Sequence, residues 1–238
     1  MISFIKVLKQ YLKYIKIKYL KRSSKALLNL FKNFPKTYLK IKYFSLRLIP
    51  SDINKHLKTI SKLTSECESV FETGVRGVVS SWAILNGLEK NKSTSKNFLM
   101  NDIEIIDINE IIKIAKKIGI DLSHEWIDNL KLNLNNNYDM TFIDTWHVYA
   151  QLKRELNLFS KITNKFIVLH DTTVDGELGE SVRQGYDIKK QSIESGFTED
   201  EISKGLWPAV EEFLEGNSDW ELMKRFTHNN GLTILKKV

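Results

Sequence analysis

The stretch that most constrains the fold is residues 70–81, Val-Phe-Glu-Thr-Gly-Val-Arg-Gly-Val-Val-Ser-Ser. Its pattern predicts a short apolar strand ending near Glu72 and Thr73, then a turn, then a helix that begins with small residues. Gly74 and Gly77 let the turn adopt positive φ and approach a ligand closely, and the helix start offers free N–H groups. The stretch therefore predicts an α/β protein with a ligand-binding loop at this turn.

The acidic residue before the turn indicates which ligand the loop suits. The spacing Glu-x-Gly-x-x-Gly lacks one glycine of the dinucleotide fingerprint Gly-x-Gly-x-x-Gly. A pyrophosphate requires amide donors without a carboxylate nearby, whereas Glu72 suits a ligand that carries a positive charge. Short glycine motifs also occur at ordinary strand–turn–helix corners, and such a corner is the alternative for this stretch alone.

The charge distribution divides the chain near residue 50. Residues 1–50 hold 13 Lys and Arg and no acidic residue, which leaves 23 basic against 29 acidic residues in the rest of the 238-residue chain. We expect a basic helical extension over residues 1–50 and one globular α/β domain over residues 51–238. The mildly acidic domain argues against a large nucleic-acid footprint on it.

The N-terminal extension has the pattern of a basic amphipathic helix. Its apolar face is expected to hold Phe4, Leu8, Tyr11, Leu12, Ile15 and Tyr19, with Lys6, Lys9, Lys13 and Lys16 opposite. For residues 1–34, packing on the domain or on a second subunit, contact with an anionic membrane surface, and nucleic-acid binding all stay open. The lysines interrupt any membrane span or signal-peptide core, and the single Cys67 suits a reducing compartment, so we expect a cytoplasmic protein.

The domain alternates between strand and helix patterns, as in a parallel sheet. Helices are expected at residues 51–64, 80–88 and 108–118 and over the apolar face from Val148 to Phe159. A further helix is expected after the Thr198–Glu201 capping box, with Gly216 just past its end. Strands are expected at residues 97–102, near 126–127, and at 138–144, 165–172, 220–226 and 232–235. Asn-Gly before the last strand predicts an antiparallel hairpin there. His56 lies off the apolar face of the first helix and is expected to be solvated.

Acidic residues follow the second and third expected strands. In a doubly wound sheet, an acid at the tip of the second strand accepts hydrogen bonds from ribose hydroxyls, and Asp102 is the candidate, with Asp107 as a competitor. Asp128, after the third strand, is expected near an adenine. Each of these acids has capping of the next helix as its alternative role.

Two later strand tips carry both a carboxylate and an imidazole. Asp144 and His147 follow one strand, and His170 and Asp171 end the next. Parallel strands end at one edge of a sheet, so these four side chains are expected to converge beside the glycine turn. They could bind a divalent cation or accept a hydroxyl proton. The stretch 173–197 follows as an expected lid.

The strand–turn–helix block resembles motif I of the class I S-adenosylmethionine-dependent methyltransferases, and later blocks follow in that family's order. The resemblance covers roughly residues 52–238 and implies a Rossmann-like, mostly parallel seven-stranded sheet that ends in an antiparallel hairpin. The cofactor-binding residues it implies, together with those inferred above, are Glu72, Thr73, Gly74, Gly77, Ser80, Asp102, Asp128 and Asp144. Val78 stands where the wider family has a further glycine.

The two His-and-Asp blocks are most similar to a narrower branch of that family. This branch includes the cephamycin-biosynthesis methyltransferase and other O-methyltransferases of secondary metabolites and glycans. Its metal-using members hold Mg²⁺ with an acid after strand four and an acidic pair after strand five, which Asp144 and Asp171 match. His170 stands where the first acid of the pair would be, so a metal stays open.

The function that follows is methyl transfer from S-adenosylmethionine to an oxygen, or less readily a nitrogen, of a small-molecule or glycan-like acceptor. Asp144, His147, His170 and Asp171 are the catalytic candidates. Two alternatives remain: an NAD-type oxidoreductase on a similar sheet, and a non-catalytic ligand-binding protein tethered by its basic extension. Glu72 and the terminal hairpin argue against the first.

Overall fold

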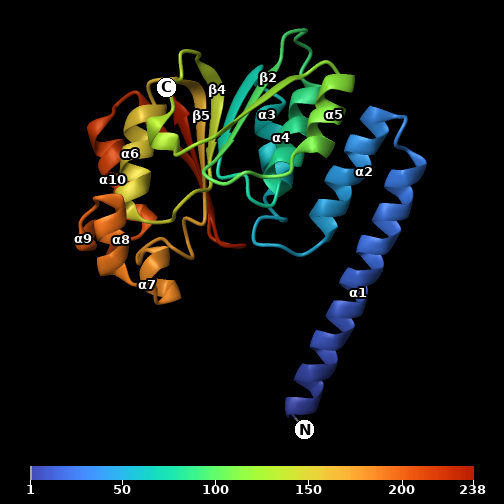
Figure 1. The fold of residues 1–238 in the computed structure, drawn as a ribbon, viewed down its shortest axis with the longest axis horizontal. Helices are drawn as coiled ribbons and strands as arrows, with labels where there is room; N and C mark the ends of the chain where they lie inside the picture. Colours follow the sequence, from blue (N-terminus) through green and yellow to red (C-terminus); the bar gives the residue numbers. More distant parts are fainter. Residues whose placement is uncertain (1) are drawn as a thin grey trace.

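The structure is a computed structural model that describes the backbone of residues 2–238 and the side chains of Lys13 and residues 15–238 (Figure 1). The strands are β1 Ser69–Thr73, β2 Asn97–Asp102, β3 Asp121–Trp126, β4 Tyr138–Ile143, β5 Thr163–His170, β6 Trp220–Phe226 and β7 Leu232–Lys237. The helices are α1 Ile2–Leu30, α2 Pro35–Leu48, α3 Leu57–Thr64, α4 Val79–Lys90, α5 Asn109–Lys117, α6 Tyr149–Phe159, α7 Glu180–Gln184, α8 Ile188–Ser195, α9 Glu199–Ser203 and α10 Leu206–Gly216. A 3₁₀ turn, η1, spans Asn129–Lys131.

Within residues 2–238 the strands form one seven-stranded sheet in the order β3-β2-β1-β4-β5-β7-β6. Strands β1 to β5 run parallel, and β7 pairs antiparallel with both β5 and β6. The predicted parallel sheet with a terminal antiparallel hairpin is therefore confirmed. Strand order reverses between β1 and β4, so the carboxyl ends of these two strands flank the crevice where such sheets bind ligands.

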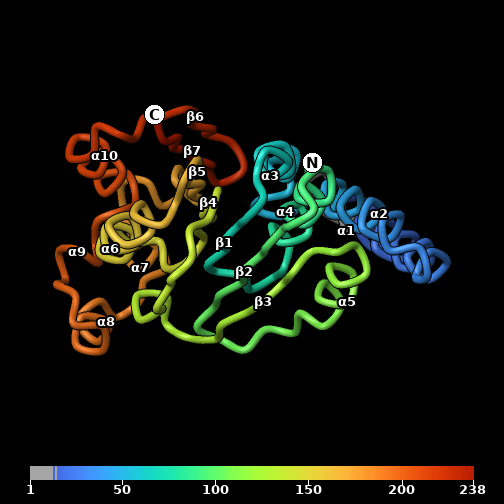
Figure 2. The backbone as a smooth tube through the Cα atoms, turned by 90° about the horizontal axis from the view of Figure 1, so that it is seen from above, coloured from blue at the N-terminus to red at the C-terminus, as the bar shows by residue number. Residues whose placement is uncertain are grey.

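Helices cover both faces of the sheet (Figure 2). Alternate residues along one strand enter different clusters: Val70 packs with the α3–α4–α5 layer, and Phe71 packs with the α6–α10 layer. Side chains alternate between the faces of a strand, so a strand covered on both faces must be apolar throughout. That requirement explains the apolar run from Phe166 to Leu169 in β5.

Three local predictions need correction. The first helix of the domain begins at Leu57 and not near residue 51. His56 is 1% exposed, because its ring lies against the terminal hairpin and its Nε2 is 2.9 Å from the carbonyl oxygen of His228. The helix after Thr198 is broken into α9 and α10, because Lys204 pairs with Leu178 and a Cβ on Gly205 would lie 2.4 Å from the oxygen of Gly176.

The segment expected as an N-terminal extension contains two helices with different surroundings. In α2, Leu39 and Tyr43 are buried in the core beside α4, and Lys42 pairs with Glu110 of α5 at 3.0 Å. Helix α1 contacts α2 and extends away from the domain (Figure 1). Phe4, Leu8, Tyr11, Leu12, Lys6 and Lys9 lie outside the described side chains. In the described part of the chain, no helix is long and apolar enough to cross a membrane.

Candidate functional site

The glycine turn after β1 is shaped by two glycines with different roles. Gly74 has φ of +86°, and a Cβ there would lie 1.9 Å from the carbonyl oxygen of Asp144, so the close approach of β1 and β4 requires glycine. A Cβ on Gly77 would meet Cγ2 of Val79 at 3.7 Å, which is an ordinary contact. The protein's own packing therefore requires glycine at 74 but not at 77.

Glu72 lies beneath this turn as an isolated buried carboxylate. It is fully buried, and neither of its oxygens has a hydrogen-bond partner among the described residues. Burial raises the pKa of Glu72 to about 8, against the opposing effect of the Ser80 and Ser81 hydroxyls. An unpaired buried carboxyl group is costly, so its presence at a ligand-binding edge needs a reason other than packing.

The side chain of Asp102 binds the backbone of the turn. Its Oδ2 accepts hydrogen bonds from the N–H groups of Val75 at 2.8 Å and Arg76 at 2.9 Å, and its Oδ1 accepts one from Glu104 at 3.1 Å. Asp102 lies at the tip of β2, as predicted, and fixes the conformation of the turn. A carboxylate has about four acceptor positions, so one remains for a further donor.

Asp128 caps the next helical turn, which was the alternative to a cofactor contact for this residue. Its Oδ1 accepts the N–H of Leu130 at 3.1 Å, which caps η1, and its Oδ2 lies 3.2 Å from Nζ of Lys131. The Thr73 hydroxyl donates to Oδ1 of Asn101 at 2.8 Å and is buried. Contact of Asp128 and Thr73 with a cofactor stays a prediction.

The four side chains from the β4 and β5 tips lie together. Oδ1 of Asp144 is 3.1 Å from Nε2 of His147 and 3.3 Å from Nδ1 of His170. Nδ1 of His147 is 3.3 Å from Oδ2 of Asp171. Asp171 itself has φ of +56°, a backbone conformation that concentrates at functional sites.

Two more carboxylates, from the expected lid, complete this cluster. Nδ1 of His147 is also 3.3 Å from Asp175 and 3.4 Å from Glu180. The only sequence signal for Asp175 is its position four residues after Asp171, which is one helical turn. In the structure its N–H donates to the Asp171 carbonyl oxygen at 3.0 Å, as in such a turn. Arg183 is exposed, and its Nη2 donates to Asp175 at 3.0 Å.

These contacts determine the charges in the cluster. Burial by itself lowers the pKa of His147, and the carboxylates, Asp144 foremost, outweigh burial and raise that pKa well above its ordinary value. Burial raises the pKa of Asp144, but His170 and His147 outweigh it and hold that pKa far below its usual range. The pKa of His170 is raised in the same way, against burial, by Asp144.

A second buried polar network lies beside the cluster, and the sequence analysis missed it. Oε1 of Glu155, on α6, accepts hydrogen bonds from Thr145 Oγ1 at 2.6 Å, Asn129 Nδ2 at 2.6 Å and Gln151 Nε2 at 2.9 Å. Asn129 also donates to Thr73 at 2.9 Å. The network thus joins the tip of β1, the turn η1 and the loop between β4 and α6.

Comparison with known proteins gives the identity of the fold. No family model matches the sequence, and no curated protein matches it. The O-methyltransferase TomG of Streptomyces achromogenes, involved in tomaymycin synthesis and solved with S-adenosylmethionine, is 13% identical, with 78% of this chain and 80% of that chain covered and a TM-score of 0.50. An O-methyltransferase of Bacillus cereus solved with S-adenosylhomocysteine is 11% identical, with 77% and 81% covered and a TM-score of 0.50. The chain has a methyltransferase fold.

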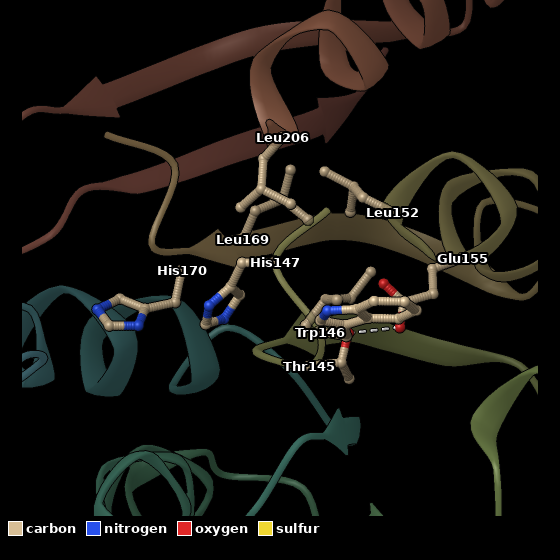
Figure 3. Close-up of a pocket in the computed structure, with 9 residues that line it drawn as sticks. Thr145, Trp146, His147, Leu152, Glu155, Leu169, His170 and Leu206 are labelled. Carbon is tan, nitrogen blue, oxygen red and sulfur yellow. Dashed lines mark hydrogen bonds between the residues drawn. The ribbon is translucent and has the colours of Figure 1, made fainter. Parts of the chain in front are cut away.

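A small cavity of about 10 Å³ lies between the histidines at the β4 and β5 tips and the Glu155 network (Figure 3). This volume holds about one water molecule. Figure 3 shows His147 and His170 on one side of it and Glu155 with its bond to Thr145 on the other. The segment 173–197 borders the same loop: the Trp146 and Phe197 rings stack at 6.0 Å, and Trp146 Nε1 donates to Ser181 at 3.1 Å. This segment therefore packs on the loop that carries His147, and its role as a lid stays a prediction.

Three side chains at the β4 and β5 tips could also bind a divalent cation. Asp144, His147 and Asp171 each offer one ligand atom, and these atoms lie within 4.8 Å of one another. Two carboxylates and an imidazole suit a borderline cation such as Zn²⁺ or Mn²⁺ better than Mg²⁺, which prefers an all-oxygen shell. The structure thus adds His147 to the two expected ligands, Asp144 and Asp171.

Proposed function

We propose that this protein transfers a methyl group from S-adenosylmethionine to an oxygen, or less readily a nitrogen, of a small-molecule or glycan-like acceptor. One observation carries the proposal: Glu72 is a fully buried carboxyl group under the glycine turn of a methyltransferase fold, and its oxygens have no hydrogen-bond partner among the described residues. An ammonium group favours the ionised form of this carboxyl group and pairs with it, whereas a pyrophosphate would be repelled by the ionised form.

The proposed cofactor site uses the residues around this turn. Glu72 holds the methionine ammonium group directly or through a neighbour, Gly77 leaves room beside the turn, and Asp102 offers its remaining acceptor position to ribose. Thr73, Gly74, Ser80, Asp128 and Asp144 complete the proposed contacts. The bound cofactor supplies an electrophilic methyl group on a positively charged sulfur.

The proposed acceptor site is the cluster at the β4 and β5 tips. Nδ1 of His170 faces Asp144, and its buried Nε2 has no partner among the described residues. A histidine oriented by a carboxylate with its other nitrogen free is the arrangement of a general base, so His170 takes the acceptor's hydroxyl proton. His147 and Asp171 orient Asp144 and His170 and bind the acceptor, and positioning in a water-poor pocket supplies much of the acceleration.

A divalent cation at Asp144, His147 and Asp171 is a second role for the same cluster. Bound there, it would polarise the acceptor oxygen as a Lewis acid. Chelator should then abolish turnover, and Asp144→Ala should lose the cation in an equilibrium dialysis measurement. Full turnover in the presence of chelator would exclude this role and leave proton transfer alone.

Calorimetric titration with S-adenosylmethionine tests the cofactor. We expect the protein to bind it and Gly77→Leu to bind it at least tenfold more weakly, because the new side chain fills the space beside the turn. Gly77→Leu tests cofactor binding more cleanly than Gly74→Val. A side chain at residue 74 would collide with the Asp144 carbonyl oxygen and disturb folding. No binding by the unmodified protein, or equal binding by Gly77→Leu, would contradict the proposal.

The same titration separates the rival functions. An oxidoreductase would bind NAD in place of S-adenosylmethionine. A non-catalytic protein would bind S-adenosylmethionine and transfer no methyl group to any acceptor of a phenol, catechol and sugar panel. Similarity of the Asp144–His147 and His170–Thr172 blocks to the cephamycin-type branch favours hydroxyl acceptors for the first panel.

A further inference from the structure

The exposed side of α1 combines an apolar stripe with positive charge. Ile15, Tyr19 and Leu30 are 45%, 71% and 73% exposed, and Ala26 is also exposed. At about 100° per residue these four positions lie within roughly 60° of one another on the helix. We call them the α1 face. Ile17, Leu20, Ser24 and Leu28, on the other side of α1, are half-buried.

Basic residues border the α1 face on both sides. Lys16 lies along one edge, and Lys18, Arg22 and Lys25 lie along the other, all of them exposed. Among the residues with described side chains, no lysine or arginine of α1 makes an ion pair, whereas Lys36 and Lys42 of α2 do. The α1 face thus presents uncompensated positive charge around apolar side chains.

This chemistry selects the partner. Residues 1–50 contain no acid, so two α1 faces placed against each other would bring like charges together. A nucleic acid would pair with the lysines but leave Ile15, Tyr19 and Leu30 in water. An anionic lipid surface accommodates both the apolar side chains and the positive charges. The apolar side chains enter the boundary of the acyl chains, and the lysine side chains extend to the headgroups.

The direction of α1 relates this surface to the candidate site. In Figure 1 the free end of α1 lies on the same side of the molecule as α7, which follows the carboxyl end of β5. The loop after β2, at the same edge of the sheet, exposes Ile103 at 74% and Ile105 at 84%. We propose that the α1 face binds an anionic lipid surface and that the carboxyl edge of the sheet faces that surface. Lipid binding does not depend on the proposed methyl transfer.

Vesicle co-sedimentation of the full chain tests the proposal. We expect binding to phosphatidylcholine vesicles that contain phosphatidylglycerol, and none to phosphatidylcholine alone. Each lysine near such a surface contributes about fivefold in affinity, so Lys18→Gln with Lys25→Gln should weaken binding roughly 25-fold. The matched control is Lys113→Gln with Lys117→Gln on α5, which removes the same charge from two exposed positions and should change nothing.

A fluorescent probe measures where the contact occurs. The single native cysteine, Cys67, is fully buried and burial raises its pKa to about 12, so it should not react with a thiol-directed probe. A polarity-sensitive probe on Tyr19→Cys should shift to the blue on anionic vesicles. The same probe on Leu158→Cys, a 42% exposed position near the end of α6 at the opposite edge of the sheet, should not shift.

Four results would overturn the proposal. The full chain could stay in solution with anionic vesicles, or the α1 and α5 lysine variants could bind equally. The α1 variants could instead dissociate a dimer in sedimentation equilibrium without changing vesicle binding. The α1 variants could also lose binding to duplex DNA or RNA while their vesicle binding stays unchanged. Circular dichroism of each variant checks that it is folded.

Discussion

Val78 stores strain at the start of α4. It has φ of +57°, a left-handed conformation that is unfavourable for a β-branched residue, at the position where the sequence resemblance expects glycine. At an ordinary helical position, a protein with glycine is less stable to unfolding than the same protein with alanine. At residue 78 we expect the glycine variant to be the more stable of the two.

We therefore predict that Val78→Gly is more stable than Val78→Ala by about 1 kcal/mol, because both remove the side chain but only glycine relieves the strain. Urea unfolding of the two variants measures the difference. As a control, Val79→Gly should be less stable than Val79→Ala, because Val79 is the first residue of α4 and glycine is the poorer helix former. An alanine variant more stable than the glycine variant at residue 78 would contradict the left-handed conformation.

Glu72 gives the protein a pH dependence with a definite sign. Its folded-state pKa of about 8 lies above its ordinary value of 4.5, so the folded state keeps a proton that the unfolded state releases between these values. Its contribution to stability is present below pH 4.5 and is lost as pH rises through about 8.

Between pH 5 and 8 this group should lower the free energy of unfolding by about 1.4 kcal/mol per pH unit. Glu72→Gln should remove that slope, as measured by urea unfolding at several pH values. The control Glu68→Gln, at an exposed neighbouring position, should keep it. Equal slopes for the native protein and Glu72→Gln would show that Glu72 is already ionised.

Glu72 also links protonation to the proposed cofactor. Near pH 7 its carboxyl group is mostly protonated, and a bound ammonium group would favour the ionised form. Binding of S-adenosylmethionine should therefore release up to about one proton at pH 7. Calorimetry in two buffers of different ionisation enthalpy measures this release, and Glu72→Gln should abolish it.

At the scale of elements, the Glu155 network holds the loop from β4 to α6. Three donors converge on one oxygen of Glu155, and burial raises the pKa of its carboxyl group against the effect of those hydrogen bonds. Asp144 and His147 are on this loop, so Glu155 acts on the candidate site through the position of the loop.

Glu155→Gln keeps an acceptor oxygen and should change the free energy of unfolding by less than about 1 kcal/mol. Glu155→Leu removes the acceptor that three donors share and leaves the Thr145 hydroxyl without its partner, so it should cost about 2 kcal/mol or more. Urea unfolding measures both variants, and methyl transfer by the glutamine variant reports the position of the loop. Similar stability of the two variants would mean that the network does not hold this loop.

At the scale of the whole molecule, the terminal hairpin closes the domain onto its beginning. Nδ2 of Asn229 donates to the carbonyl oxygen of Ser51 at 2.8 Å and to that of Asp52, and its Oδ1 accepts the N–H of Lys55 at 2.8 Å. One side chain thus joins the loop between β6 and β7 to the segment before α3.

Asn229→Gly keeps the positive φ of 53° and removes these bonds, so it should lower the free energy of unfolding by about 2 kcal/mol. The melting temperature should fall by roughly 5 °C. Lys55→Ala is the control, because the backbone N–H that bonds Asn229 is kept. An unchanged melting temperature for Asn229→Gly would contradict the role of this clamp.

Local chemistry explains which parts of the fold the sequence could predict. Alternation and apolar runs gave six of the strands close to their observed bounds, and the Asn-Gly signal gave the hairpin. The start of α3 and the break between α9 and α10 depend on partners distant in sequence, such as His228 for His56. A single-chain pattern does not contain those partners.

The sequence by itself determined most of the strands, the helices between them as far as α6, the glycine turn, and the four side chains at the tips of β4 and β5, because periodicity and turn chemistry are local. Only the tertiary structure decided that Asp175, Glu180 and the Glu155 network join them and that Asp102 binds the turn. It also decided that Glu72 is left without a hydrogen-bond partner in the described part of the chain. The physical reason is that hydrogen bonding and burial of a side chain depend on which distant segments pack around it.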